Sequence, residues 1–140
     1  PTSKEAARKL DQALALNPDS ARTHRMLGDT SNLRGDPRAA EIHYDAALAL
    51  GGEELAARRG MAVALLAQRR PREAAMHLRR AALLDPADPG VHNDLGVALA
   101  QQGLEIPAQR AFEEALRLAP AHEDARANLG RLEQQRQTRP

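Results

Sequence analysis

Residues 74–86 read AAMHLRRAALLDP, with alanine, leucine, alanine and proline at positions 74, 78, 81 and 86. The same spacing of a small residue, a bulky residue, a second small residue and a closing turn residue occurs four times in the chain. The four stretches are residues 6–18, 40–52, 74–86 and 108–120. Their closing positions 18, 52, 86 and 120 each differ by 34. A fixed period of this length indicates an architecture of stacked repeats.

A second motif recurs in the same register and lies in the other half of each repeat. It consists of the pairs Leu27-Gly28, Met61-Ala62, Leu95-Gly96 and Leu129-Gly130. Together the two motifs resemble the tetratricopeptide repeat (TPR), and the resemblance covers almost the whole chain. It implies an all-α fold, a TPR solenoid of about eight helices. Antiparallel helix hairpins would stack into a right-handed superhelix, with a concave groove lined by the first helix of each hairpin.

The resemblance predicts a single TPR domain over residues 1–140. Its expected parts are the second helix of a partial repeat (1–20), full repeats at 21–54, 55–88 and 89–122, and a C-terminal capping helix with its tail (123–140).

Turn residues and alanines mark the expected boundaries and contacts of these helices. Asp36-Pro37 and Asp88-Pro89 each pair an N-cap acceptor with a proline at the first helical position. Gly35 and Gly103 are placed for left-handed turns inside the hairpins. The closest helix contacts are expected at alanines 40, 47, 74, 81, 108 and 115.

Composition limits the classes of function that the chain can have. Hydrophobic residues make up 42%, yet the chain has one Phe, one Tyr and no Trp, so the core is expected to be built from alanine and leucine. The net charge of +1 and the lack of aromatic stacking platforms argue against nucleic-acid binding. The absence of cysteine excludes disulfides and thiolate ligands. With no apolar run of spanning length, membrane association is expected only indirectly, through a partner or a lipid anchor.

No constellation of residues indicates catalysis or metal binding. The three serines at 3, 20 and 31 lie outside any nucleophile elbow or phosphate loop. His43 and His77 occupy equivalent positions in adjacent repeats, and packed helices about 8–10 Å apart are too distant for direct metal–nitrogen bonds. We therefore expect no enzyme, no catalytic residue, no cofactor and no metal.

The resemblance implies a partner-binding groove, because positions 2, 5, 9 and 12 of each first helix face the concave side in TPR proteins. The candidate residues are Arg22, Arg25, Asp29, Arg59, Val63, Leu66, Asn93 and Val97. Such a surface, apolar in the middle with arginines toward one end, suits an amphipathic helix or an extended segment with apolar anchors. The alternative is that the small apolar residues only pack neighbouring helices.

One TPR subclass binds the acidic C-terminus of chaperones through a carboxylate clamp. At its five positions this chain offers Arg25, Asp29, Gly60, Gly90 and Asp94, of which only Arg25 has the required charge. Recognition of a chaperone peptide is therefore not expected.

Two further surfaces are candidates for contacts. Arg69, Arg70 and Arg72 cluster at one turn and form a basic edge that could meet an acidic protein or anionic lipids, or simply be solvated. On the first helix, Leu10, Leu14 and Leu16 have no preceding helix to cover them. We therefore expect either an upstream segment or self-association through this helix.

The sequence thus predicts a non-catalytic scaffold that binds a partner protein in its groove. Short, Ala/Arg-rich bacterial TPR chains resemble assembly factors for envelope machines, such as the pilus and secretion lipoproteins that escort an outer-membrane secretin. That resemblance favours the periplasm or the inner face of the outer membrane over the cytoplasm. Two alternatives are a regulatory or substrate-recruiting segment of a larger enzyme and a self-associating structural module.

Overall fold

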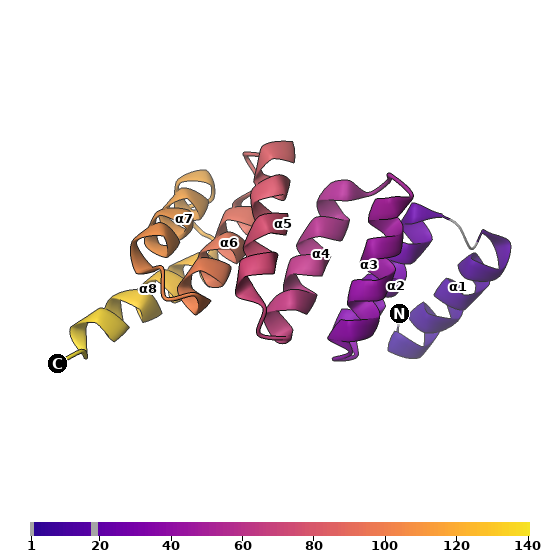
Figure 1. Ribbon diagram of the computed structural model, residues 1–140, viewed down its shortest axis with the longest axis horizontal. Coiled ribbons are helices and arrows are strands. Elements are labelled where there is room, and N and C mark those ends of the chain that lie inside the picture. Colours follow the sequence, from indigo (N-terminus) through magenta and orange to yellow (C-terminus); the bar gives the residue numbers. More distant parts are fainter. Residues whose placement is uncertain (1, 18–19) are drawn as a thin grey trace. The chain divides into compact units, whose positions relative to one another are not determined.

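The computed structural model describes residues 2–17 and 20–140 of the chain. Within them the chain forms eight helices and no strand, as the repeat pattern predicts (Figure 1). The helices are α1 (Ser3–Leu16), α2 (Ala21–Leu33), α3 (Pro37–Ala49), α4 (Glu54–Ala67), α5 (Pro71–Leu84), α6 (Pro89–Gln101), α7 (Glu105–Leu118) and α8 (Glu123–Gln137). None of these helices is both long and apolar enough to cross a lipid bilayer.

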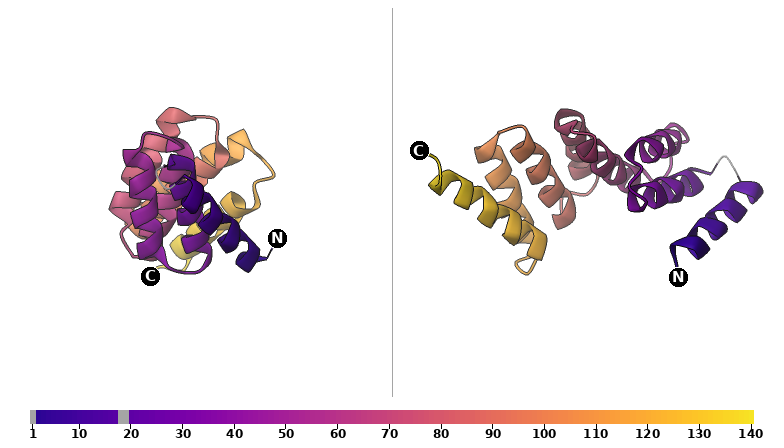
Figure 2. Two further views of the ribbon diagram at one scale, coloured as in Figure 1. Left: turned by 90° about the vertical axis from the view of Figure 1, so that its right-hand side faces the viewer. Right: turned by 90° about the horizontal axis from the view of Figure 1, so that it is seen from below.

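The helices divide into two compact units, residues 1–70 (unit 1) and 71–140 (unit 2). The division falls between α4 and α5, inside the repeat expected at 55–88. In unit 1, α3 packs against α2 and α4, which also contact each other, and α1 packs against α2. In unit 2, α7 packs in the same way against α6 and α8, and α5 packs against α6. Within unit 1 α2 lies beside α3, and within unit 2 α6 lies beside α7 (Figure 1 and the right-hand view of Figure 2).

The predicted helix starts and turns are present. Asp36 Oδ1 accepts a hydrogen bond from the backbone N–H of Ala39 at 3.1 Å, and Asp88 Oδ1 accepts one from Gly90 at 2.9 Å. Each cap satisfies a backbone donor that the first helical turn leaves without a partner. Gly35 and Gly103 have φ values of +74° and +76°, the left-handed conformation that glycine adopts without steric cost.

The alanines that the sequence places at helix contacts are buried. The alanines at 40, 47, 74, 81, 108 and 115 are all 0% exposed. Between them the bulky residue of each second helix, Tyr44, Leu78 or Phe112, is also buried. Methyl side chains let neighbouring helices approach, and one large side chain per repeat fills the space between them.

One residue of the first helix, Leu10, departs from the expectation that it lacks cover. Leu10 is only 3% exposed, because α1 packs against α2 of the same unit. The expectation is therefore wrong for Leu10. The side chains of Leu14 and Leu16 lie outside the described residues.

Candidate functional site

An aromatic ring from the second helix of a hairpin rests on glycines of first helices in both units. In unit 1 the ring of Tyr44 lies against Gly28 of α2 and Gly60 of α4. A Cβ atom at Gly28 would lie 2.6 Å from ring carbon Cε1 of Tyr44, and one at Gly60 would also collide with the ring. In unit 2 the ring of Phe112 occupies the same register and excludes a Cβ at Gly96. The rings therefore explain the glycines at 28, 60 and 96, whereas a Cβ at Gly130 of α8 would meet nothing within 4 Å.

A polar network surrounds the ring in unit 1. The hydroxyl of Tyr44 donates to Asp29 Oδ1 at 2.5 Å, and Asn32 Nδ2 donates to the same hydroxyl at 3.1 Å and to the carbonyl oxygen of Gly60 at 3.0 Å. Arg25 Nη1 donates to Asp29 Oδ2 at 2.7 Å. Burial and the hydrogen bond to Asp29 raise the pKa of Tyr44, so the phenol remains a neutral donor. The polar groups facing the ring thus bind one another.

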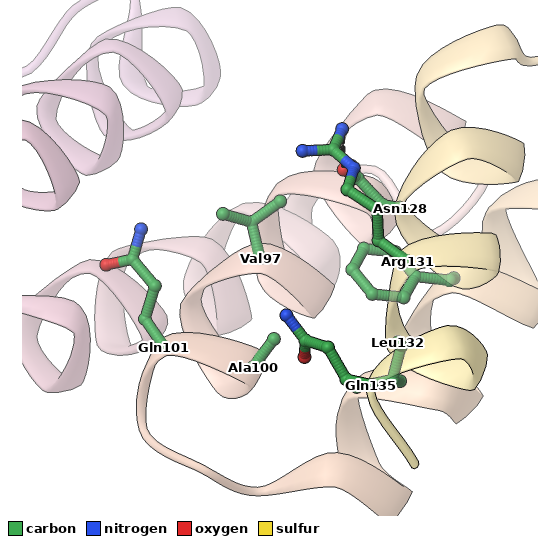
Figure 3. Close-up of a pocket in the computed structure, with 8 residues that line it drawn as sticks. Val97, Ala100, Gln101, Asn128, Arg131, Leu132 and Gln135 are labelled. Carbon is green, nitrogen blue, oxygen red and sulfur yellow. Dashed lines mark hydrogen bonds between the residues drawn. The ribbon is translucent and has the colours of Figure 1, made fainter. Parts of the chain in front are cut away.

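A pocket of about 220 Å³ lies at the equivalent place in unit 2, between α6, α7 and α8 (Figure 3). Its apolar lining is Val97 and Ala100 from α6, Phe112 from α7 and Leu132 from α8, and its polar lining is Gln101, Asn128, Arg131 and Gln135. In the 34-residue register, Val97, Ala100 and Phe112 replace Asp29, Asn32 and Tyr44 of unit 1. The network of unit 1 therefore has no counterpart at these three positions.

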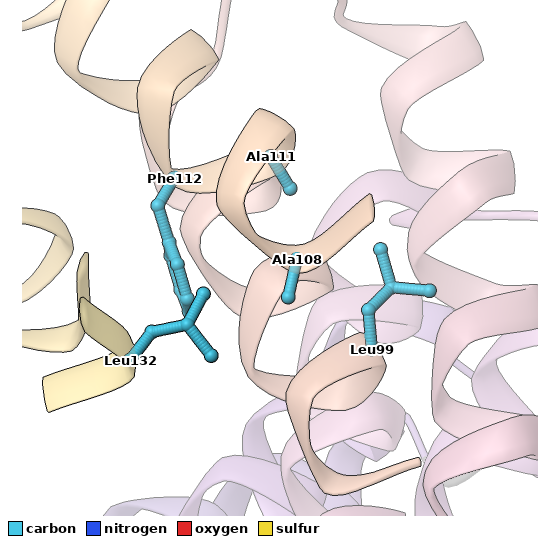
Figure 4. Close-up of a cluster of buried hydrophobic side chains, with 5 residues drawn as sticks. All are labelled: Leu99, Ala108, Ala111, Phe112 and Leu132. Atoms are coloured by element: carbon cyan, nitrogen blue, oxygen red, sulfur yellow. The ribbon is translucent and has the colours of Figure 1, made fainter. Parts of the chain in front are cut away.

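The apolar side of the pocket is backed by the core of unit 2. Phe112 and Leu132 face each other within a buried cluster that also contains Leu99, Ala108 and Ala111 (Figure 4). Val97 and Ala100 are partly buried and pack against this cluster. A pocket wall that belongs to a close-packed core is held in place before any ligand arrives.

Two asparagines and an arginine connect the polar side of the pocket. Asn128 Nδ2 of α8 donates to Oδ1 of the buried Asn93 of α6 at 3.0 Å. Arg131 Nη2 donates to Asn128 Oδ1 at 2.9 Å. The amide pair bridges α6 and α8, while Arg131 stays exposed at the rim.

The sequence-predicted groove residues all lie on α2, α4 or α6. In unit 1 Arg22 is exposed, Val63 is 48% exposed, and Arg59 and Leu66 are half-buried. Arg25 is ion-paired with Asp29, and its Nε lies 3.9 Å from Glu53 Oε2.

In unit 2 Val97 lines the pocket, and Asn93 supports it through Asn128. Sequence reasoning missed Phe112, Asn128 and Leu132, because they lie outside the family positions used for the groove. A partner-binding role for all of these residues remains a prediction.

One of the three arginines of the basic edge is neutralised by an ion pair. Arg70 Nη1 forms an ion pair with Glu41 Oε2 at 2.8 Å. Arg69 is exposed and has a φ of +60°. It occupies the register position of Gly35 and Gly103, so its left-handed backbone replaces a glycine turn. Arg72 is exposed at the start of α5.

The sequence did not predict one histidine pair. The rings of His24 on α2 and His43 on α3 stack with centroids 5.9 Å apart. Burial and the neighbouring His24 lower the pKa of His43. Among the described residues, no group of three or more His, Cys, Asp or Glu side chains could hold a metal ion.

The comparisons with known proteins identify the class. The family profile of the tetratricopeptide repeat matches residues 3–58 and 59–104, more than half of the sequence. The chain therefore belongs to the TPR family, whose members are generally non-catalytic modules for protein–protein interaction. No curated protein matches the chain in sequence.

Solved structures of this family superpose on between 81% and 97% of the chain. PilF of Pseudomonas aeruginosa is 26% identical with a TM-score of 0.84, over 96% of this chain and 62% of that one. The chain thus spans less than two thirds of that protein. YrrB, described as a TPR protein with an unusual peptide-binding site, is 25% identical with a TM-score of 0.79, over 97% of this chain and 72% of that one. The second TPR domain of human RPAP3, solved with an HSP70 peptide, is 22% identical with a TM-score of 0.74, over 81% of this chain and 98% of that one, and shows the fold alone.

Proposed function

We propose that the chain is a non-catalytic scaffold that binds a segment of a partner protein along its first helices. The observation that carries this proposal is the pocket between α6 and α8. Its floor is apolar and preformed, and its rim is polar. Peptide-binding surfaces combine such apolar pockets for anchoring side chains with amides that bind the peptide backbone.

The proposal extends to the half-exposed apolar side chains of α4 in unit 1. Val63 and Leu66 lie on one first helix and offer apolar contact area. Arg25 contributes less than its charge suggests, because its guanidinium is already paired with Asp29. We therefore place the strongest contacts of the partner at Val97 rather than at Arg25.

A more specific form of the proposal makes the chain an assembly factor for a bacterial envelope machine of the pilus or secretion type. The Ala/Arg-rich composition favours this form. The likeness to PilF of Pseudomonas aeruginosa over 96% of the chain supports it. Placement in the periplasm or at the inner face of the outer membrane belongs to the same proposal.

The scaffold is tested by comparing Val97→Asp with Met76→Asp in affinity capture from a bacterial lysate. Val97 lines the pocket, whereas Met76 is a 67% exposed apolar residue on α5 of the same unit. We expect a groove partner to be captured by the wild type and by Met76→Asp and to be lost with Val97→Asp. In titration calorimetry with the purified partner, Val97→Asp should weaken the binding free energy by about 2 kcal/mol, which is roughly a 30-fold loss of affinity. Unchanged affinity in a folded Val97→Asp variant would exclude the pocket as the binding site of the partner.

The envelope role needs a separate measurement in cells. Replacing the chromosomal copy with Val97→Asp should reduce the amount of assembled outer-membrane secretin on an immunoblot, and Met76→Asp should not. Normal assembly with Val97→Asp, together with lost partner binding in calorimetry, would reject the envelope role and leave the scaffold in place.

A further inference from the structure

Arg131 is the charged residue that lines the α6–α8 pocket, and within the described part of the chain it has no carboxylate partner. Its Nη2 binds only the neutral amide oxygen of Asn128. None of the eight lining residues is acidic. A guanidinium beside an apolar pocket, without a counter-charge, attracts a carboxylate.

Contacts around the pocket hold this arrangement before a ligand binds. The Asn93–Asn128 hydrogen bond fixes Asn128, which in turn holds the guanidinium of Arg131. Near the end of α8, Arg136 Nε lies 3.3 Å from Glu105 Oε2 and its Nη1 donates to Gln109 Oε1 at 2.6 Å, both on α7. A preformed site loses less conformational entropy on binding than a flexible one.

The size of the pocket indicates what enters it. At about 220 Å³ it is smaller than the roughly 300–1,000 Å³ of typical small-molecule sites. One large apolar side chain is a suitable occupant, in contact with Val97, Phe112 and Leu132. The amides of Gln101 and Gln135 at the same pocket can bind the backbone of an extended segment (Figure 3).

We infer that the α6–α8 pocket binds a protein segment in which a large apolar residue stands beside an aspartate or glutamate. The apolar side chain enters the pocket, and the carboxylate pairs with Arg131. This inference rests on the proposed scaffold function and adds the chemistry of the partner.

The equivalent position in unit 1 does not share this chemistry. Asp29 takes the register of Val97, and its carboxylate already binds Tyr44 and Arg25. A second carboxylate there would meet a like charge, which disfavours an acidic segment. The inferred specificity therefore belongs to unit 2.

The first experiment pans a phage-displayed library of random dodecapeptides on the full chain and on the variants Val97→Asp and Arg131→Glu. We expect the wild type to enrich peptides with a large apolar residue next to Asp or Glu, and Val97→Asp to lose them. Arg131→Glu should instead select Lys or Arg beside the apolar residue. Peptides that depend on Val97 but show no acidic preference would overturn the inference and leave the scaffold standing. If no peptide depends on Val97, both fail.

The second experiment is a double-mutant cycle between the protein and one enriched peptide, with binding measured by fluorescence polarisation. Arg131→Gln in the protein and Asp→Asn in the peptide should each weaken binding roughly three- to tenfold, and the two together should weaken it no more than either alone. Added salt should weaken the wild-type complex more than the Arg131→Gln complex. Arg110→Gln, the same charge change at an exposed residue of α7, should leave affinity unchanged. Fully additive losses would contradict a direct contact between the two groups.

Discussion

Tyr44 of unit 1 and Phe112 of unit 2 occupy the same position in the repeat and differ by one hydroxyl. Around Tyr44, that hydroxyl donates a hydrogen bond to Asp29 and accepts one from Asn32, so the three side chains form one polar network. Around Phe112, valine and alanine stand at those two positions, and an apolar pocket remains. The ring supports the hairpin in both units. The residues that face the ring decide whether the surface is a satisfied polar network or a site that can receive a ligand.

The largest effect is expected from removing the ring in unit 2. Phe112→Ala should reduce the free energy of unfolding by about 3–5 kcal/mol, because the cavity would open inside the buried cluster with Leu132. Urea denaturation followed by circular dichroism gives the value. Ile106→Ala, at an exposed residue of the same helix, should change it by less than about 0.5 kcal/mol. Similar losses in the two variants would mean that the ring is not the support of unit 2.

Removing only the hydroxyl in unit 1 should have a smaller effect. Tyr44→Phe leaves Asp29 and Asn32 each without one hydrogen-bond partner, which should cost about 1–3 kcal/mol in the same denaturation experiment. Adding Asp29→Val and Asn32→Ala copies the residues of unit 2 and should restore part of that loss. A neutral Tyr44→Phe variant would show that the network contributes no stability.

The glycine contacts provide a matched pair of substitutions at one register position. Gly96→Ala should cost about 1–3 kcal/mol, because its Cβ would collide with the ring of Phe112. Gly130→Ala meets nothing within 4 Å and should stabilise α8 by up to about 1 kcal/mol through its higher helix propensity. Thermal melts of the two variants should therefore shift in opposite directions. A shift in the same direction would contradict the assigned ring contact.

The smallest effect on stability is expected from the stacked histidines of unit 1. Their contribution should be lost in mild acid. The pKa of His43 is lowered in the folded state, so the unfolded chain takes up a proton more readily. The contribution of His43 to the free energy of unfolding is constant at pH values well above 6.5, the ordinary pKa of histidine. It decreases as the pH falls from 6.5 toward the folded-state pKa. Denaturation midpoints across this range should decrease less for His43→Gln than for the wild type. Equal slopes would rule out His43 as the titrating group.

The parts of the fold that the sequence predicted depend on chemistry repeated at short range. The cap at Asp36, the turn at Gly35 and the alanine contacts each recur at a fixed spacing, so one pattern locates all of them. Leu10 was misjudged because the cover it receives from α2 depends on how a partial repeat packs, which no local pattern encodes.

The site was predictable only in part, because it depends on contacts between helices. Val97 follows from its place in the repeat, whereas Asn128 and Leu132 become lining residues only when α8 packs against α6 and α7. One signal of the contrast between the units was present in the sequence. Asp29 and Asn32 are polar where the next two repeats have apolar residues, and they accompany the single tyrosine.

The contact of Tyr44 with two glycines on different helices also limits how this sequence can diverge. A side chain at Gly28 or Gly60 is tolerated only after the ring has been replaced by something smaller, so the order in which substitutions arise matters. A Cβ at Gly130 meets no neighbouring side chain, so a substitution there does not require a change elsewhere. Descendants of this chain should therefore show linked changes at 28, 44 and 60 and independent change at 130.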